Sequence, residues 1–387
     1  MIQANHLNQK TSRFEKQDHL IIQIWQDLVC QSIHSRASDI HIEAGEAQCP
    51  IRLRIDGNLY LHQELSKEIC LRLVTRIKIL ARLDIAEQRL PQDGRLRIGL
   101  NADKPNLDCR VSSLPTLYGE KIVLRILSSS LQDLDLHRLG FFPSQLVQFK
   151  KAINHPYGLI LVTGPTGSGK TRTLYSALHY LNDSSRNICS VEDPIEMRLD
   201  GVNQVAFHPK AGLHFDLIIR AILRQDPDVI MIGEIRDSIT AKLAIQAAQT
   251  GHLVLSTLHT QDAISAINRL EYLGIPIDLI ANCLICITAQ RLVKKICKAC
   301  LSPDAKSNPT NCLVCKGNGY FGRTGIHEVL TVSPNLAIQI TNKISSQELR
   351  RLSQNEGFTS LDEATEILVK QGVIDSHCLN QANSLGR

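Results

Sequence analysis

The stretch that most constrains the fold is GPTGSGKT, residues 164–171, which matches the pattern G-x-x-x-x-G-K-[ST] at every position. It follows the apolar run GLILVT and precedes a stretch whose apolar side chains recur with helical spacing. A glycine-rich loop between a strand and a helix lets backbone N–H groups point at phosphate oxygens. The pattern therefore predicts a nucleotide-binding P-loop. A simple glycine turn between strand and helix is the alternative.

Residue type assigns a role to each position of this loop. Lys170 is expected to reach the β and γ phosphates of ATP, and the Thr171 hydroxyl to bind Mg²⁺. The remaining positions, whose backbone would surround the phosphates, are Gly164, Pro165, Thr166, Gly167, Ser168 and Gly169. Arg172 is unusual, because a cation in the first turn of a helix opposes the helix dipole. We expect it to face a phosphate or an acidic residue of the adjoining domain.

Four short apolar runs, each followed by a stretch with helical periodicity, surround this motif. They read GLILVTG, NICSVED, DVIMIGE and HLVLSTLH. Runs of Val, Ile and Leu without polar alternation are typical of parallel strands that are buried on both faces. We therefore expect an α/β nucleotide-binding domain over residues 141–387, with a helical C-terminal part at 333–387.

Polar residues stand where these predicted strands end. Glu234 follows VIMIG and would place a carboxylate beside the magnesium. Glu192, Asp193 and Glu196 lie in VEDPIE, where a carboxylate could accept the proton of an attacking water. His259 closes a further strand. Open α/β sheets bind ligands at the carboxyl ends of their strands, so these residues are candidate catalytic groups. A solvated acidic turn and a structural histidine are the alternatives.

The first third of the chain has a different periodicity. After a helical stretch from residue 18, the segment IRLRIDGNLYLH at 51–62 alternates apolar and polar residues around an Asp-Gly turn. Three more alternating segments follow a second helical stretch. We predict a flexible N-terminus at 1–17, a small α+β domain at 18–128 and a linker at 129–140.

Two pairs of cysteines predict a metal site inserted in the second domain, over residues 297–315. The motifs CKAC and CLVC are separated by eleven residues, a spacing typical of a structural Cys₄ zinc site with no ligand position left for water. The four ligands are Cys297, Cys300, Cys312 and Cys315. Four free thiols are the alternative. The other eight of the 12 cysteines are scattered, which favours reduced thiols in a cytosolic protein.

Composition argues against several classes of protein. The net charge of +5 over 387 residues and the aromatic content of 4% give no indication of a path for nucleic acid. No secretory signal is recognisable at the start of the sequence. The most apolar window, residues 277–289, is shorter than the ~20 residues that span a bilayer. We therefore expect a cytosolic chain.

Together with the P-loop, nine further motifs form a pattern over roughly residues 35–330. They are ASDIHIE, RLRIDG, RLPQDGR, RVSSLPT, VEDPIE, RAILRQDPDVIMIGEIRD, TGHLVLSTLHT, AQRLVKKIC and GYFGRTGIHEVL. In order and spacing this set resembles the type II secretion and type IV pilus assembly ATPases. The resemblance implies a hexameric ring whose chains have an N-terminal PAS-like domain and a C-terminal RecA-like domain.

The resemblance also implies roles for single residues. Glu196 matches the general base, Glu234 the Walker B acid and His259 the sensor of the γ phosphate. Arg95 and Arg110, which by pattern alone lie on solvated strand faces, match arginines that reach the triphosphate from the neighbouring domain across the ring. The active site would therefore be composite.

By resemblance, the chain is a motor that hydrolyses Mg-ATP to assemble pilin or pseudopilin filaments. Its partner would be a platform protein, and it would lie at the cytoplasmic face of the inner membrane. The zinc site favours assembly, because retraction members usually lack it. Pilus retraction, a conjugation-type ATPase and an ATP-binding scaffold with negligible hydrolysis are the alternatives.

Four features depart from the family pattern. The sequence begins near the PAS-like domain, so we expect no separate N-terminal docking domain, and the docking partner stays open. Arg172 and Gln261 replace a small hydroxyl residue and an asparagine. The segment before Arg220 is more apolar than in relatives.

Overall fold

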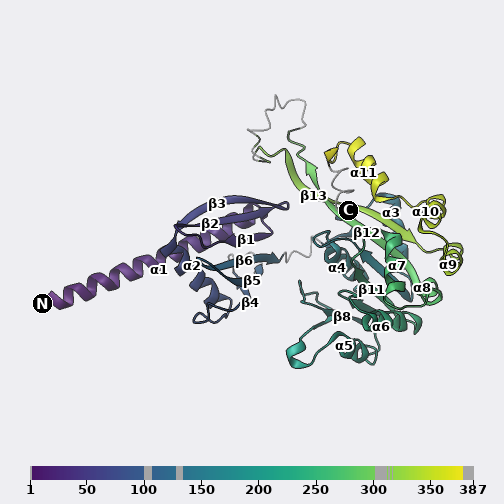
Figure 1. Ribbon diagram of the computed structural model, residues 1–387, viewed down its shortest axis with the longest axis horizontal. Helices are drawn as coiled ribbons and strands as arrows, with labels where there is room; N and C mark the ends of the chain where they lie inside the picture. The colour runs from purple at the N-terminus through teal and green to yellow at the C-terminus, as the bar shows by residue number, and fades with distance from the viewer. Residues whose placement is uncertain are drawn as a thin grey trace. The chain divides into compact units, whose positions relative to one another are not determined.

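The computed structural model describes residues 2–99, 107–127, 134–300, 312, 314–315 and 317–377. The chain divides into two compact units, Met1–Ser129 and Ser130–Arg387 (Figure 1). The division falls inside the predicted linker at 129–140. Leu134 and Leu136, however, are buried in the core of the second unit, so the described part of that linker packs as part of this unit.

The first unit contains a six-stranded sheet in the order β3-β2-β1-β6-β5-β4, in which every neighbouring pair is antiparallel. The strands are β1 (Asp39–Ile42), β2 (Gln48–Ile55), β3 (Asn58–Ser66), β4 (Gln92–Ile98), β5 (Leu107–Thr116) and β6 (Gly119–Leu127). Apolar residues alternate along these strands, as the sequence pattern predicted, so one face of the sheet is apolar and the other carries charged side chains.

Two helices, α1 (Ile2–His34) and α2 (Lys67–Leu80), cover the apolar face of this sheet. Leu28 of α1 and Leu73 of α2 are fully buried in the shared core. Residues 1–17 were predicted to be flexible, but α1 already begins at Ile2. No proline or glycine interrupts the chain between Ile2 and His34, so no helix-breaking residue ends the helix earlier.

A disulfide joins Cys49 on β2 to Cys70 on α2. The prediction of reduced thiols outside the zinc site is therefore wrong for this pair. Both side chains point into the core between the sheet and α2, which brings together two cysteines 21 residues apart. Sequence spacing alone cannot indicate such a pairing.

The second unit is built on a seven-stranded sheet in the order β13-β12-β7-β11-β10-β8-β9. All neighbouring strands are parallel except β12 and β13, which form an antiparallel pair. The four strands that the apolar runs predicted are β7 (Gly158–Thr163), β8 (Ile188–Glu192), β10 (Val229–Ile232) and β11 (Leu253–Leu258). Every residue in these four strands is buried, as the absence of polar alternation predicted.

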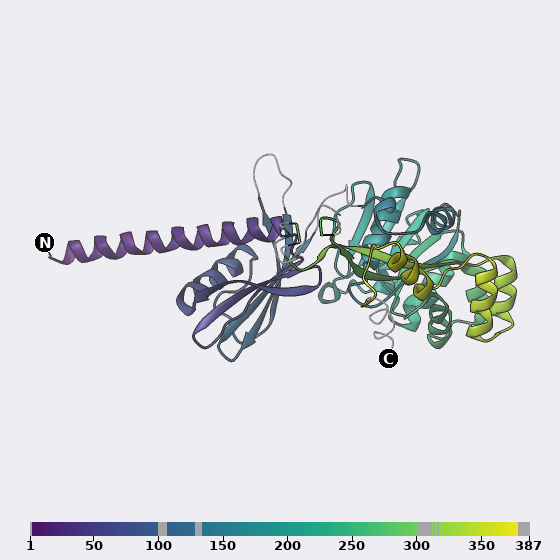
Figure 2. The same cartoon turned by 90° about the horizontal axis from the view of Figure 1, so that it is seen from above.

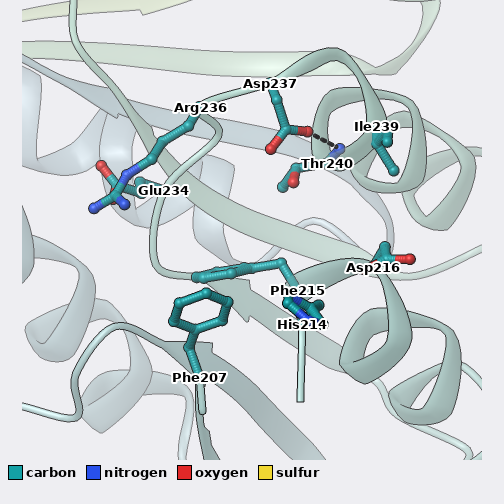
Figure 3. Close-up of a pocket in the computed structure, with 9 residues that line it drawn as sticks. All are labelled: Phe207, His214, Phe215, Asp216, Glu234, Arg236, Asp237, Ile239 and Thr240. Atoms are coloured by element: carbon teal, nitrogen blue, oxygen red, sulfur yellow. Dashed lines mark hydrogen bonds and ion pairs between the residues drawn. The ribbon is translucent and has the colours of Figure 1, made fainter. Parts of the chain in front are cut away.

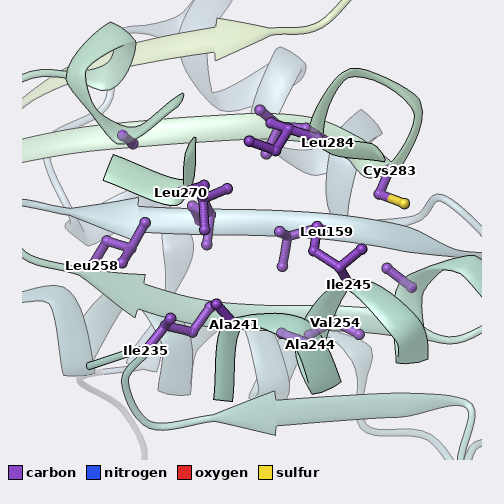
Figure 4. Close-up of a cluster of buried hydrophobic side chains, with 14 of the residues drawn as sticks. Leu159, Ile235, Ala241, Ala244, Ile245, Val254, Leu258, Leu270, Cys283 and Leu284 are labelled. Carbon is purple, nitrogen blue, oxygen red and sulfur yellow. The ribbon is translucent and has the colours of Figure 1, made fainter. Parts of the chain in front are cut away.

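Helices pack on both faces of this sheet (Figure 2). One face is covered by α3 (Pro143–Ile153) and α4 (Lys170–Leu181), the other by α5 (Phe215–Ile222), α6 (Ser238–Gln249) and α7 (Ala263–Tyr272). Figure 4 shows the second of these cores, where Ala244 of α6 and Leu270 of α7 lie against sheet residues such as Leu159. None of the helices in the described part of the chain has the length and apolar character needed to cross a bilayer.

Three strands of this sheet were not anticipated from the sequence. They are β9 (Val202–Ala206), β12 (Leu284–Ile296) and β13 (Tyr320–Thr331). The apolar window at 277–289 divides between a short helix, α8 (Ile277–Cys283), and the start of β12. Short apolar runs fit a strand or a buried helix equally well, which explains the omission of β12.

Within the residues described up to 377, three helices follow β13, as predicted for the C-terminal part. They are α9 (Pro334–Thr341), α10 (Ser346–Asn355) and α11 (Leu361–Lys370). Ser360 caps α11 through a capping box: the Glu363 amide donates to its hydroxyl, and the Glu363 carboxylate accepts from its backbone N–H at 2.8 Å.

Candidate nucleotide-binding site

The P-loop connects the buried strand β7 to the first turn of α4, as the sequence predicted. Gly164, Gly167 and Gly169 all have positive φ angles, which residues with a side chain rarely adopt. A Cβ on Gly164 would also collide with the backbone of Gln290 on the adjacent strand β12. The loop shape therefore requires glycine at these positions, which explains the pattern in physical terms.

Lys170 bends back over the loop that precedes it. Its Nζ donates to the carbonyl oxygens of Gly164 at 2.8 Å and Pro165 at 3.0 Å. Burial lowers the pKa of Lys170, and the nearby Glu234 carboxylate opposes this shift. The ammonium group thus lies at the centre of the loop, where an anionic ligand would stabilise its charge.

The carboxyl ends of β10 and β11 bring two predicted residues together. The Nε2 atom of His259 lies 3.6 Å from a carboxylate oxygen of Glu234. Arg236 also contacts Glu234, and its guanidinium lies 3.6 Å from the Asp193 carboxylate after β8. The nearby Lys170 contributes to the pKa of His259. Lys170, Glu234 and His259 therefore form one group at one edge of the sheet.

Burial and the positive charge of Lys170 lower the pKa of His259, with Glu234 acting in the opposite direction. The imidazole is consequently neutral at pH 7. A neutral imidazole has one N–H that donates and one nitrogen that accepts, so His259 can donate a hydrogen bond to a phosphate oxygen without adding charge.

Glu196 lies beyond the end of β8 with an exposed side chain. Its backbone N–H donates to the Tyr175 hydroxyl at 3.2 Å, which fixes this loop against α4. Thr171 is half-buried and Arg172 is exposed in the first turn of the same helix. The catalytic assignment of Glu196 and the role of Arg172 stay predictions.

No role was predicted for Gln290, which supports the P-loop from β12. Its side-chain amide donates to the Ser168 carbonyl at 2.7 Å, and its amide oxygen accepts from the Thr173 hydroxyl at 2.8 Å. The next residue, Arg291, donates to the Gln261 carbonyl at 2.6 Å in the segment after His259. The motif AQRLVKKIC was the only sequence signal at this position.

A pocket of about 240 Å³ opens beside Glu234 (Figure 3). Phe207 and Phe215 form one wall, with ring centroids 5.1 Å apart, and Glu234 and Arg236 lie at the opposite side. Asp237 caps α6 by accepting from the Thr240 amide at 2.8 Å. The segment that follows β10, with Glu234 and Arg236, therefore borders both the P-loop and a partly aromatic pocket.

The four predicted metal ligands meet at the tip of the β12–β13 hairpin. Their Sγ atoms all lie within 4.8 Å of one another, with Cys297 and Cys312 3.9 Å apart and Cys300 and Cys315 3.3 Å apart. A tetrahedral zinc with Zn–S bonds of ~2.3 Å separates its sulfur ligands by about 3.8 Å. Four thiols at this spacing, with no disulfide among them, fit a structural Zn²⁺ ion.

Arg95 and Arg110 lie opposite each other on β4 and β5, so both project from the same face of the first unit's sheet. Arg125 continues this row on β6. The Arg110 guanidinium is 3.6 Å from the Asp93 carboxylate, and both side chains are exposed. The structure therefore brings the two predicted arginines together on the charged face of the first unit.

Comparison with known proteins identifies the family. The model of the type II/IV secretion system protein family matches residues 14–382. This chain belongs to that family. The resemblance drawn from the sequence motifs is thus confirmed.

The chain is 44% identical over 365 residues to the type IV pilus assembly ATPase PilB of Myxococcus xanthus, covering 89% of this chain and 64% of PilB. It is 42% identical over 399 residues to the type II secretion system ATPase E of Vibrio cholerae, covering 94% and 78%. It therefore spans slightly less than two thirds of that PilB.

Its structure is similar to the crystal structure of the pilus retraction motor PilT with bound ADP. The TM-score is 0.67 at 27% identity, and the match covers 92% of this chain and 96% of PilT. The second unit thus has the expected P-loop ATPase fold. The PAS-like classification of the first unit stays a prediction.

Proposed function

We propose that this chain is a motor that hydrolyses Mg-ATP and uses the free energy to assemble pilin or pseudopilin filaments. The observation that carries the proposal is the meeting of Lys170, Glu234 and His259 at the carboxyl edge of the sheet. The names of two relatives, a pilus assembly ATPase and a type II secretion ATPase, support the choice of process.

Each group of the site has a part in hydrolysis. The P-loop amides and Lys170 bind the phosphates, and the neutral His259 donates to an oxygen of the γ phosphate. Glu196 accepts the proton of the attacking water. Thr171 and Glu234 would hold Mg²⁺, which when bound neutralises phosphate charge. Zinc at the Cys₄ cluster would keep the hairpin tip closed.

Arg95 and Arg110 complete the site from the first unit of a neighbouring chain. An arginine that stabilises phosphoryl charge from outside the P-loop raises the rate by ~10³-fold or more. This role implies a ring of chains, for which the family resemblance suggests a hexamer. The motor would act on a platform protein at the cytoplasmic face of the inner membrane.

The test of hydrolysis uses the purified full-length chain and measures phosphate release from Mg-ATP. Lys170→Ala and Glu234→Gln should each remove nearly all turnover. Phosphate release that does not depend on Lys170 would refute the assigned site, and absence of turnover in the wild type would favour an ATP-binding scaffold. Light scattering on the same samples reports whether the 43.1 kDa chain forms a hexamer.

Pilus retraction is the second candidate, because the structure also matches a retraction motor. The Cys₄ cluster favours assembly over retraction, since by resemblance retraction members usually lack it. Deletion of the gene distinguishes a role in assembly from a role in retraction. Loss of surface filaments would support assembly, whereas an excess of filaments would support retraction.

A further inference from the structure

A buried hydrogen-bond network joins the P-loop helix to the loop that carries Glu196. Its centre is Tyr175 on α4, which is 2% exposed, and Glu192 at the end of β8, which is 3% exposed. The Tyr175 hydroxyl contacts a carboxylate oxygen of Glu192. The same hydroxyl accepts from the backbone N–H groups of Glu196 at 3.2 Å and Met197 at 3.3 Å.

These contacts use the full hydrogen-bonding capacity of the Tyr175 hydroxyl. A phenolic hydroxyl has one proton to donate and two lone pairs that accept. Because the two backbone N–H groups can only donate, the hydroxyl proton must point at the Glu192 carboxylate. Burial, together with the neighbouring Glu192 charge, raises the pKa of Tyr175, so the proton stays on the hydroxyl. The orientation of the group is therefore fixed by its partners.

Glu192 is held from its other side by two further donors. Ser190 and Gln204 donate to its second oxygen at 2.7 Å and 3.0 Å. The Gln204 amide also donates to the Met197 carbonyl at 2.9 Å and accepts from the Leu199 backbone N–H at 2.9 Å. Six hydrogen bonds, three each from the side chains of Tyr175 and Gln204, thus connect the segment 196–199 and Glu192.

Glu192 has no cationic partner within the described part of the chain. A buried carboxylate without a countercharge is costly to keep unless hydrogen bonds satisfy it. Here its partners are Tyr175, Ser190 and Gln204, and its burial excludes it from contact with an attacking water. Of the two glutamates in VEDPIE, only Glu196 is exposed, so Glu192 acts on the site through the network alone.

We propose that Tyr175, Glu192 and Gln204 are positioning residues that hold the backbone of Glu196 in register with the P-loop helix. This inference rests on the proposed role of Glu196 as the general base. Because α4 begins at Lys170, the phosphate-binding helix and the base-carrying loop share one hydrogen-bonded unit. A small displacement of a reacting group costs on the order of 100-fold in rate, which is why such positioning matters.

The experiment replaces Tyr175 by Phe, which keeps the ring in the core and removes only the hydroxyl. The full-length variant should lose on the order of 10- to 100-fold in kcat, with KM for Mg-ATP and the Kd for ADP within about two-fold of the wild type. Tyr180→Phe is the matched control, because Tyr180 lies on the same helix but is 46% exposed. It should keep wild-type kinetics.

A second arm tests whether Tyr175 acts through Glu196. Glu196→Gln alone should remove most hydrolysis, and adding Tyr175→Phe should cause no further loss. A further loss in the double variant, or an unchanged kcat in Tyr175→Phe, would overturn the inference while leaving Glu196 as the base. Undiminished hydrolysis in Glu196→Gln would overturn the proposed base and the inference together.

Should Tyr175→Phe fail to give folded protein, Gln204→Met takes its place. This change removes the bonds to Glu192, Met197 and Leu199 at a half-buried position of β9. We expect the same reduction in kcat without a change in KM. An unchanged kcat in this variant would refute the positioning role.

Discussion

His327 on β13 makes the stability of the second unit dependent on pH. The imidazole is 2% exposed and stacks on Phe141, with ring centroids 3.9 Å apart. Its Nε2–H donates to the Leu139 carbonyl at 3.0 Å, whereas Nδ1 is buried with no hydrogen-bond partner. Protonation of Nδ1 would bury a charge and a donor with no acceptor. Burial accordingly lowers the pKa of His327 to about 4.

The size and sign of the effect follow from this pKa. An unfolded histidine titrates near 6.5, so between pH 6.5 and 4 the unfolded chain binds more protons than the folded one. The stabilisation is therefore present in full above pH 6.5 and is lost as the pH falls. At 1.36 kcal/mol per pKa unit, the loss amounts to about 2.5 kcal/mol at pH 4.5 and about 3 kcal/mol near pH 4.

Urea unfolding followed by circular dichroism measures this loss between pH 7.5 and 4.5. His327→Gln retains a donor for the Leu139 carbonyl but does not titrate, so the free-energy difference between wild type and variant should shrink by about 2.5 kcal/mol over that range. Val329→Ala, buried on the same strand, should lower stability equally at every pH. A difference between wild type and His327→Gln that does not change with pH would refute the reasoning.

Three further predictions concern the nucleotide site and the hairpin. Arg95→Ala or Arg110→Ala should leave nucleotide binding intact and lower hydrolysis by ~10³-fold; unchanged turnover would contradict the composite site. Metal analysis should find one zinc ion per wild-type chain, and Cys300→Ser should lose this zinc and destabilise the hairpin tip. Wild-type protein without zinc would contradict the predicted metal site. Gln290→Leu leaves the buried Ser168 carbonyl unsatisfied, so it should cost about 1–3 kcal/mol in unfolding free energy and weaken ADP binding. Unaltered stability and affinity would argue against this support of the P-loop.

Much of the second unit could be predicted because its chemistry is local in the sequence. The phosphate loop is indicated by its glycines, Gly164, Gly167 and Gly169, because only glycine readily adopts the backbone angles that the loop requires. The apolar runs beside the loop predict buried parallel strands. The edge strand β9 was missed because its sequence VNQVA is partly exposed and lacks such a run.

Pairings between distant segments could not be predicted in this way. The Cys49–Cys70 disulfide depends on how α2 packs on β2, and the support of Ser168 by Gln290 joins residues 122 positions apart. The length of α1 was not predicted, because its first residues are mostly polar. A polar segment with neither proline nor glycine carries no signal that distinguishes helix from disorder.

By itself the sequence determined the phosphate loop, the buried strands, the four cysteines of the predicted metal site and the family, because each depends on residue type at short spacing. Only the tertiary structure decided which of the candidate carboxylates are buried and which are exposed. Glu192 and Glu196 are four residues apart in one motif, yet one is buried against Tyr175 and the other is exposed. The physical reason is that the segments which bury a carboxylate and supply its hydrogen-bond partners are remote from it in the sequence. Their packing determines whether water can reach the carboxylate.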